Sequence, residues 1–101
     1  DDIEYETKAD GKFLTPEILP VLEDLTARLS GLDGFTTENI RSLFDRYMEE
    51  KELKLGKIAQ PVRVALTGGT VSPGIFEVMD ILGKDEVLKR LQKAVSHISA
   101  K

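Results

Sequence analysis

The chain contains 101 residues, of which 41% are hydrophobic and 32% charged, a size and composition typical of one globular domain with a single core. No apolar run approaches the ~20 residues that a membrane-spanning helix requires, and the first residues lack the basic and apolar regions of a secretory signal. The absence of cysteine and the single histidine, His97, exclude disulfides, cysteine nucleophiles, thiolate zinc sites and multi-histidine metal sites. We therefore expect a soluble, cytoplasmic protein that contacts no membrane.

Charge is distributed unevenly along the chain. Residues 1–50 hold 5 Lys and Arg against 13 Asp and Glu, whereas residues 51–101 hold 9 against 5, so the halves carry −8 and +4 within the total of −4. A negative total disfavours nucleic-acid binding, but a local excess of positive charge can support it. The asymmetry indicates an acidic supporting half and a basic half that binds a partner. Two ordinary solvated surfaces are the alternative.

Apolar residues recur at helical spacing through most of the chain, and the runs are bounded by residues that start or stop helices. No second convincing strand is present with which a strand could pair. The sequence therefore predicts an all-α, compact domain of about five helices. We interpret residues 1–14 as a charged, irregular connecting segment and residues 15–101 as the helical domain.

The first two helices carry clear end signals. Thr15 suits the cap of the first helix, and Gly31 suits its stop. Pro20 lacks an amide proton, so it either lies within the first turn or marks the start of the regular helix after a separate turn. Thr36 is the predicted cap of the second helix, and Phe44 lies in the middle of its apolar stripe, which we assign to the core.

The chain between residues 51 and 68 is harder to interpret. Residues 51–57 are predicted as a basic connector that contains Gly56. The following segment alternates as a strand would, but Pro61 at a first helical position and Gly68 as a stop suit a short helix. We favour the helix.

The last two helices follow a glycine loop at residues 68–71. Ser72, Pro73 and Gly74 are predicted as the cap, first turn and close-approach glycine of a helix that Gly83 ends. Asp85 is predicted to cap the final helix. Three basic side chains of that helix are predicted to face outward: Lys89, Arg90 and Lys93.

Catalytic interpretations find little support in the sequence. The adjacent carboxylates Glu23/Asp24 and Glu49/Glu50 lie on outward helix faces without a base or metal beside them. His97 has no partnering motif, and the glycine loop lacks the spacing of a phosphate loop. We predict no catalytic residue and no metal site.

A different arrangement suits base recognition. Arg63, the glycine loop and the predicted helix start at Ser72 lie within a dozen residues. Free amides at a helix start can donate to phosphates or to base edges, a glycine lets a flat base approach the backbone, and an arginine adds a charge-assisted fork. Single-stranded RNA is read by such edge contacts. A capped helix after a turn is the structural alternative.

Several short stretches between residues 54 and 91 resemble a known family. Residues 54–68 read Lys-Leu-Gly-Lys-Ile-Ala-Gln-Pro-Val-Arg-Val-Ala-Leu-Thr-Gly, and residues 72–77 read Ser-Pro-Gly-Ile-Phe-Glu, followed by Leu-Gly-Lys at 82–84 and Lys-Arg-Leu at 89–91. This closely resembles the C-terminal end of bacterial glutamate–tRNA ligases, and a looser match extends over nearly the whole chain. In that family the region is an all-helical anticodon-binding subdomain behind a class I catalytic domain.

The resemblance implies a tRNA anticodon site and a set of contacts. By position it assigns anticodon binding to Arg63, Ser72, Pro73, Gly74 and Ile75. We add three candidates for backbone-phosphate contacts: Lys84, Lys89 and Arg90. Ser72 stands where some relatives have threonine, so its hydrogen bonding transfers more securely than its packing.

The same resemblance implies a division of labour. The signatures that bind ATP and glutamate are missing, so we expect no enzymatic activity and no cofactor here; ATP and Mg belong to the missing catalytic domain. The expected partner is the anticodon loop of glutamate tRNA, with no DNA and no membrane, and the expected state is a monomer. A helical protein–protein interaction module without RNA binding is the alternative function.

Overall fold

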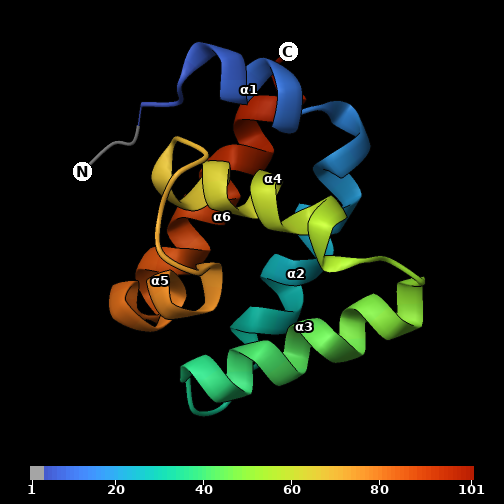
Figure 1. Ribbon diagram of the computed structural model, residues 1–101, viewed down its shortest axis with the longest axis vertical. Helices are drawn as coiled ribbons and strands as arrows, with labels where there is room; N and C mark the ends of the chain where they lie inside the picture. The colour runs from blue at the N-terminus through green and yellow to red at the C-terminus, as the bar shows by residue number, and fades with distance from the viewer. Residues whose placement is uncertain (1–3) are drawn as a thin grey trace.

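The computed structural model describes residues 4–101, which fold into a compact all-α arrangement (Figure 1). The predicted fold class is thus confirmed, with six α-helices and a short 3-10 turn in the described part of the chain. Their bounds are α1 Thr7–Phe13, η1 Pro16–Ile18, α2 Leu19–Ser30, α3 Thr37–Lys51, α4 Leu55–Thr67, α5 Ile75–Leu82 and α6 Lys84–Ser99. None of these helices is long and apolar enough to cross a membrane.

Helices α2 and α6 pack along each other more extensively than any other pair. Figure 1 shows α1 above α4, and α3 along the opposite side of the molecule. The buried side chains of all six helices join in one apolar core. Phe44 of α3 is fully buried there, and its ring meets that of Phe76 of α5 edge-on, with 5.1 Å between the ring centroids.

The prediction that the residues before Thr15 are irregular was wrong for residues 7–13, while residues 1–3 lie outside the described part of the chain. Residues 7–13 form α1, which packs on α4 and buries Ala9 and the following Leu14. Its apolar signal is short, because a helix of 7 residues presents little more than one inward position per turn. The segment is therefore held by tertiary packing that a local pattern does not reveal.

The structure decides between the two alternatives for Pro20 at the start of the first predicted helix. Residues 16–18 form the separate 3-10 turn, and α2 begins at Leu19 with Pro20 in its first turn and ends at Gly31, as expected. Thr15 precedes the 3-10 turn, but its side chain makes no capping hydrogen bond. The proline is tolerated because the first amides of a helix have no partner within the helix.

The N-terminus of α3 is capped twice. The Thr36 hydroxyl accepts from the Asn39 amide at 3.2 Å, which confirms the predicted cap. A second cap comes from α5, because the Asp80 carboxylate accepts from the Thr37 amide at 2.9 Å and from the Thr37 hydroxyl at 2.8 Å. A carboxylate at a helix N-terminus also complements the helix dipole. The second cap fastens α5 to α3.

Helix α4 begins earlier than predicted. It starts at Leu55, so the connector is only residues 52–54, and Gly56 and Pro61 lie inside the helix. The preferred helical interpretation and the stop at Gly68 are confirmed; the placement of Pro61 at a first position was wrong. The proline removes the amide that would donate to the carbonyl of Lys57, an exposed residue.

A single glycine joins α5 to α6. The Gly83 amide donates to the Met79 carbonyl at 2.9 Å, and the Gly83 carbonyl accepts from the Val87 amide at 3.0 Å. Its φ of 86° favours glycine. Gly83 therefore ends α5 as predicted and also begins α6, so the predicted cap at Asp85 was wrong. Asp85 lies in the first turn instead.

The end of α6 is fastened to α1 by a polar cluster. The Asp10 carboxylate lies 2.9 Å from His97 Nε2 and 2.7 Å from Lys101 Nζ, which also donates to the Leu14 carbonyl at 2.7 Å. Burial raises the pKa of Asp10, but the hydrogen bonds from Lys101 and His97 outweigh it, so the pKa lies below its ordinary value of 3.8.

We predict that Phe44→Ala unfolds the domain or nearly so. Truncating a buried aromatic costs about 3–5 kcal/mol, which is a large part of the stability of a small domain. Val71→Ala is the matched control, because Val71 is 93% exposed. Thermal melts followed by circular dichroism should show a large decrease in stability for the first variant and almost none for the second. Equal melting temperatures would contradict the core assignment.

We predict that Asp10→Asn lowers the stability at neutral pH by on the order of 1 kcal/mol, because charge-assisted hydrogen bonds are weakened at a partly exposed site. A lowered pKa contributes stability above the unfolded-state value, and that contribution disappears as the pH falls through the folded-state pKa. The gap in melting temperature between wild type and variant should therefore shrink below about pH 4. A gap that grows with acidity would refute this account.

Candidate nucleic-acid interface

The residues predicted to read the anticodon lie where α4 ends and α5 begins. Arg63 Nε donates to the Ser72 hydroxyl at 2.9 Å, so the arginine and the serine that the sequence placed nine positions apart are in direct contact. The Gln60 side-chain oxygen accepts from the same guanidinium. Arg63 is half-buried, and its position is fixed by residues on two elements.

The loop between the two helices is held by short contacts at its base. The Thr67 hydroxyl donates to the Arg63 carbonyl at 2.8 Å and lies 3.3 Å from the Gly69 amide. Gly68 has a φ of 86°, a conformation that favours glycine. The Gly68 carbonyl also accepts from the Glu6 amide at 2.8 Å, so the chain just before α1 supports the loop.

Ser72 does not cap α5, contrary to prediction. The cap position belongs to Gly74, and α5 begins at Ile75. The Ser72 hydroxyl instead accepts from Arg63 and donates to the Pro73 carbonyl at 2.8 Å. Its proximity to the arginine outweighs a local capping role, because a hydrogen bond to a charged group is stronger than one to a neutral group.

The remaining predicted residues differ in exposure. Pro73 and Gly74 are exposed at the surface, whereas Ile75 is only 4% exposed and anchors α5 in the core. The Glu77 carboxylate lies against Gly74, where an added Cβ would collide with Glu77 Oε2. A negative group at this helix start disfavours phosphate and favours hydrogen-bond donors of a base edge.

The three candidates for phosphate contacts do not form one free patch. Lys84 is half-buried and donates to the Leu32 carbonyl at 3.1 Å. Arg90 is half-buried, donates to the Leu66 carbonyl at 2.7 Å and pairs with Glu86 on its own helix. Lys89 is exposed. The sequence pattern revealed the charges but not these internal partners.

The adjacent carboxylates have structural surroundings. Asp24 accepts from the Tyr47 hydroxyl at 3.3 Å, and Glu50 pairs with Arg28 across α2 and α3, while Glu23 and Glu49 are exposed. The Arg28 hydrogen bond lowers the pKa of Glu50. Asp24 and Glu50 are thus engaged with structural partners, and the two glutamates beside them are exposed, which does not suit a proton-transfer site.

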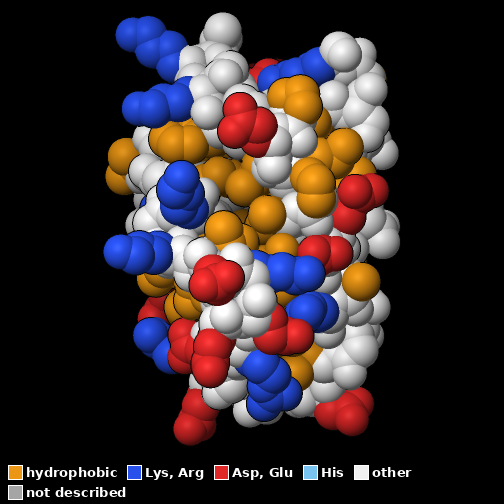
Figure 2. Space-filling view, turned by 90° about the vertical axis from the view of Figure 1, so that its right-hand side faces the viewer, with side chains coloured by type: hydrophobic (Ala, Val, Ile, Leu, Met, Phe, Trp, Pro, Cys, Tyr) orange, Lys and Arg blue, Asp and Glu red, His pale blue; other side chains and the backbone are white. Residues whose placement is uncertain are grey.

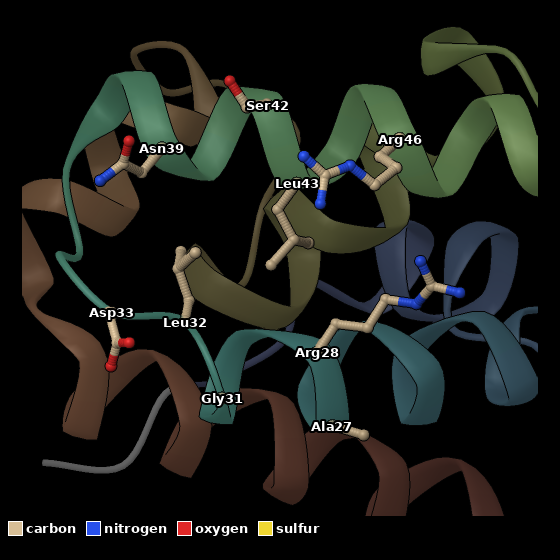
Figure 3. Close-up of a pocket in the computed structure, with 9 residues that line it drawn as sticks. All are labelled: Ala27, Arg28, Gly31, Leu32, Asp33, Asn39, Ser42, Leu43 and Arg46. Atoms are coloured by element: carbon tan, nitrogen blue, oxygen red, sulfur yellow. The ribbon is translucent and has the colours of Figure 1, made fainter.

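Other hollows lie away from the Arg63 site. A cavity of about 520 Å³ separates α2 from α3, and in Figure 3 the side chains of Arg28 and Arg46 extend into it, with Asp33 at the other end. A smaller hollow of about 320 Å³ includes Phe13 and Ile18 in its lining. Figure 2 shows one side of the molecule, with hydrophobic side chains framed by charged ones.

Comparison with known proteins identifies the family. The model of the family described as "Anticodon binding domain" matches residues 1–95. The chain belongs to this family. The anticodon binding domain thus has the all-helical architecture that the resemblance implied, with the matched region covering every helix from α1 to most of α6.

The individual relatives and the solved structure that the chain resembles are glutamate–tRNA ligases. The chain is 54% identical over 98 residues to the glutamate–tRNA ligase of Syntrophobacter fumaroxidans, covering 97% of this chain and 21% of that protein. It is 41% identical over 97 residues to that of Geobacter sulfurreducens, covering 96% and 21%. The crystal structure of a glutamate tRNA ligase from Elizabethkingia meningosepticum superposes with a TM-score of 0.87 at 32% identity, covering 94% of this chain and 19% of that one. This anticodon binding domain therefore spans about a fifth of the length of these relatives.

Proposed function

We propose that this domain reads anticodon bases of glutamate tRNA as the C-terminal part of a glutamate–tRNA ligase. The observation that carries the proposal is the contact between Arg63 and Ser72, which brings a guanidinium fork and a hydroxyl together beside an exposed loop. Family membership and the similarity to glutamate–tRNA ligases support the choice of partner.

The chemistry of the site suits the edge of an unstacked base. Two of the guanidinium nitrogens of Arg63 already contact Ser72 and Gln60, and the remaining hydrogens can donate to ring nitrogens or carbonyl oxygens of a base. Glu77 offers an acceptor for an exocyclic amino group. Pro73 and Gly74 are exposed, so a base can approach the backbone there, beside the Glu77 carboxylate. Such edge and stacking contacts are how single-stranded RNA is read.

The proposed parent enzyme divides binding from chemistry. This domain would hold the anticodon arm, while a catalytic domain outside this chain binds ATP, Mg and glutamate and attaches the amino acid. We keep a cytoplasmic, monomeric protein as part of the proposal. Lys89 remains the exposed candidate on α6 for a phosphate contact, and Lys84 and Arg90 would contribute through hydrogens that they do not already use.

We predict that the chain by itself gives no ATP–pyrophosphate exchange with glutamate, since the proposed activity requires the catalytic domain. The measurement uses the purified 101-residue chain, with a full-length relative as the positive control. Exchange above background that co-purifies with the chain would show that the division of labour is wrong.

We predict that Arg63→Gln weakens binding of an anticodon stem-loop and reduces the preference for the cognate sequence, because a base-reading arginine carries about 1–3 kcal/mol of discrimination. The variant also lacks a hydrogen bond within the protein, so its melting temperature should fall by a few degrees. Fluorescence anisotropy with cognate and altered stem-loops measures the first effect.

Ser72→Ala and Gln60→Ala separate the charge of Arg63 from its positioning, because each removes one partner of the guanidinium and leaves its charge in place. They should lower the melting temperature about as much as Arg63→Gln while retaining more of the affinity. If Arg63→Gln bound cognate and altered stem-loops as the wild type does, the assignment of Arg63 would be refuted.

A further inference from the structure

We propose that the RNA surface continues from Arg63 onto α1, where Lys8 and Lys12 contact the phosphates of nucleotides next to the base that is read. The inference rests on the proposed function and identifies the source of its backbone contacts. It places them in the acidic half of the sequence, where the charge totals predicted only a support.

The geometry joins the two sites. A hollow of about 440 Å³ lies between α1, the middle of α4 and the loop, and it is lined by Glu6, Lys8, Ala9, Lys12, Phe13, Gln60 and Thr70. Gln60 is the shared residue, because its side-chain oxygen accepts from the Arg63 guanidinium. Figure 1 shows α1 lying above α4, with the loop between residues 68 and 74 at the start of α1. A strand that leaves the Arg63 site can therefore pass directly over α1.

The two lysines are free to bind an anion. Both are exposed, and no ion pair joins either of them to an acidic residue within residues 4–101. Lys12 Nζ lies 5.3 Å from the centre of the Phe13 ring, and this interaction leaves its hydrogens available to solvent. They differ in this from Lys84 and Arg90, whose side chains donate to carbonyls of the protein.

The acidic residue of the hollow has a separate role. The Glu6 amide donates to the Gly68 carbonyl, and the Glu6 carboxylate lies against Gly69, where a Cβ would come within 2.7 Å of Oε2. Its charge is thus directed at the base of the loop. With two lysines against one carboxylate, the hollow keeps a positive balance.

The occupant that fits is the ribose–phosphate backbone of a single-stranded RNA loop. Gln60 has its oxygen engaged with Arg63, so its amide group is left to donate. Thr70 adds a half-buried hydroxyl, and Phe13 a half-buried ring. Donors and positive charge match phosphate oxygens, and an aromatic surface suits a sugar or base in an unstacked strand.

The test uses the 101-residue chain and a labelled anticodon stem-loop, with binding measured by anisotropy over a range of salt concentrations. The double variant Lys8→Gln/Lys12→Gln should bind more weakly. Its plot of log K against log salt should be less steep by about 1.4, because each phosphate of a single strand that a lysine neutralises adds about 0.7 to the slope. Cognate and altered loops should be weakened alike, because phosphate contacts carry no base information.

Two further variants sharpen the result. Lys51→Gln removes an exposed lysine at the end of α3, on the opposite side of the molecule, and should leave the slope unchanged (Figure 1). Glu6→Gln removes the negative charge from the hollow at nearly constant shape and should strengthen binding several-fold. Melting temperatures of the lysine variants should stay close to that of the wild type, because these side chains are exposed.

The outcomes separate this proposal from the one on which it rests. If the double variant binds as tightly as the wild type and with the same salt slope, the role of α1 is refuted. That result would not affect the proposal for Arg63. A double variant that no longer distinguished cognate from altered loops would also overturn the role of α1 in phosphate binding. If the wild type bound no stem-loop at all, both proposals would fail together.

Discussion

The hydrogen bond from Arg63 to Ser72 is the contact on which the candidate site depends. It spans α4 and the loop before α5, so it fixes the loop and orients the guanidinium in one step. Gln60 accepts from the guanidinium, Thr67 donates to the Arg63 carbonyl, and the Glu6 amide donates to the loop at Gly68. A base would then meet donors that are already in place, which lowers the entropic cost of binding.

The net charge of each half of the chain does not match the distribution of exposed basic side chains in the folded molecule. The half of the chain with the positive balance contains Lys84 and Arg90, which the fold turns toward backbone carbonyls. The half with the negative balance contains α1, which the fold places over α4 beside the Arg63 site. Net charge by segment therefore does not predict which basic side chains the fold engages with backbone carbonyls and which it leaves exposed.

The sequence was informative at several positions where the determining contacts are local. The Thr36 cap, the stops at Gly31 and Gly68, and the interpretation of the ambiguous segment as helix rest on neighbours a few residues apart, and all were confirmed. Two errors arose where a distant contact decides, whereas the caps predicted at Thr15 and Asp85 failed within their own turns. Ser72 turns to Arg63 and α1 is formed by packing on α4, and no local pattern encodes either partner. The family motif, rather than periodicity, identified the candidate base-reading residues.

The carboxylate of Asp80 couples the position of α5 to the N-terminus of α3. Because Asp80 lies on α5 and caps α3, one of the two caps of α3 depends on the position of α5. Gly83 ties α5 to α6 with no intervening linker. A displacement of α5 would therefore disturb the start of α3 and the start of α6 together.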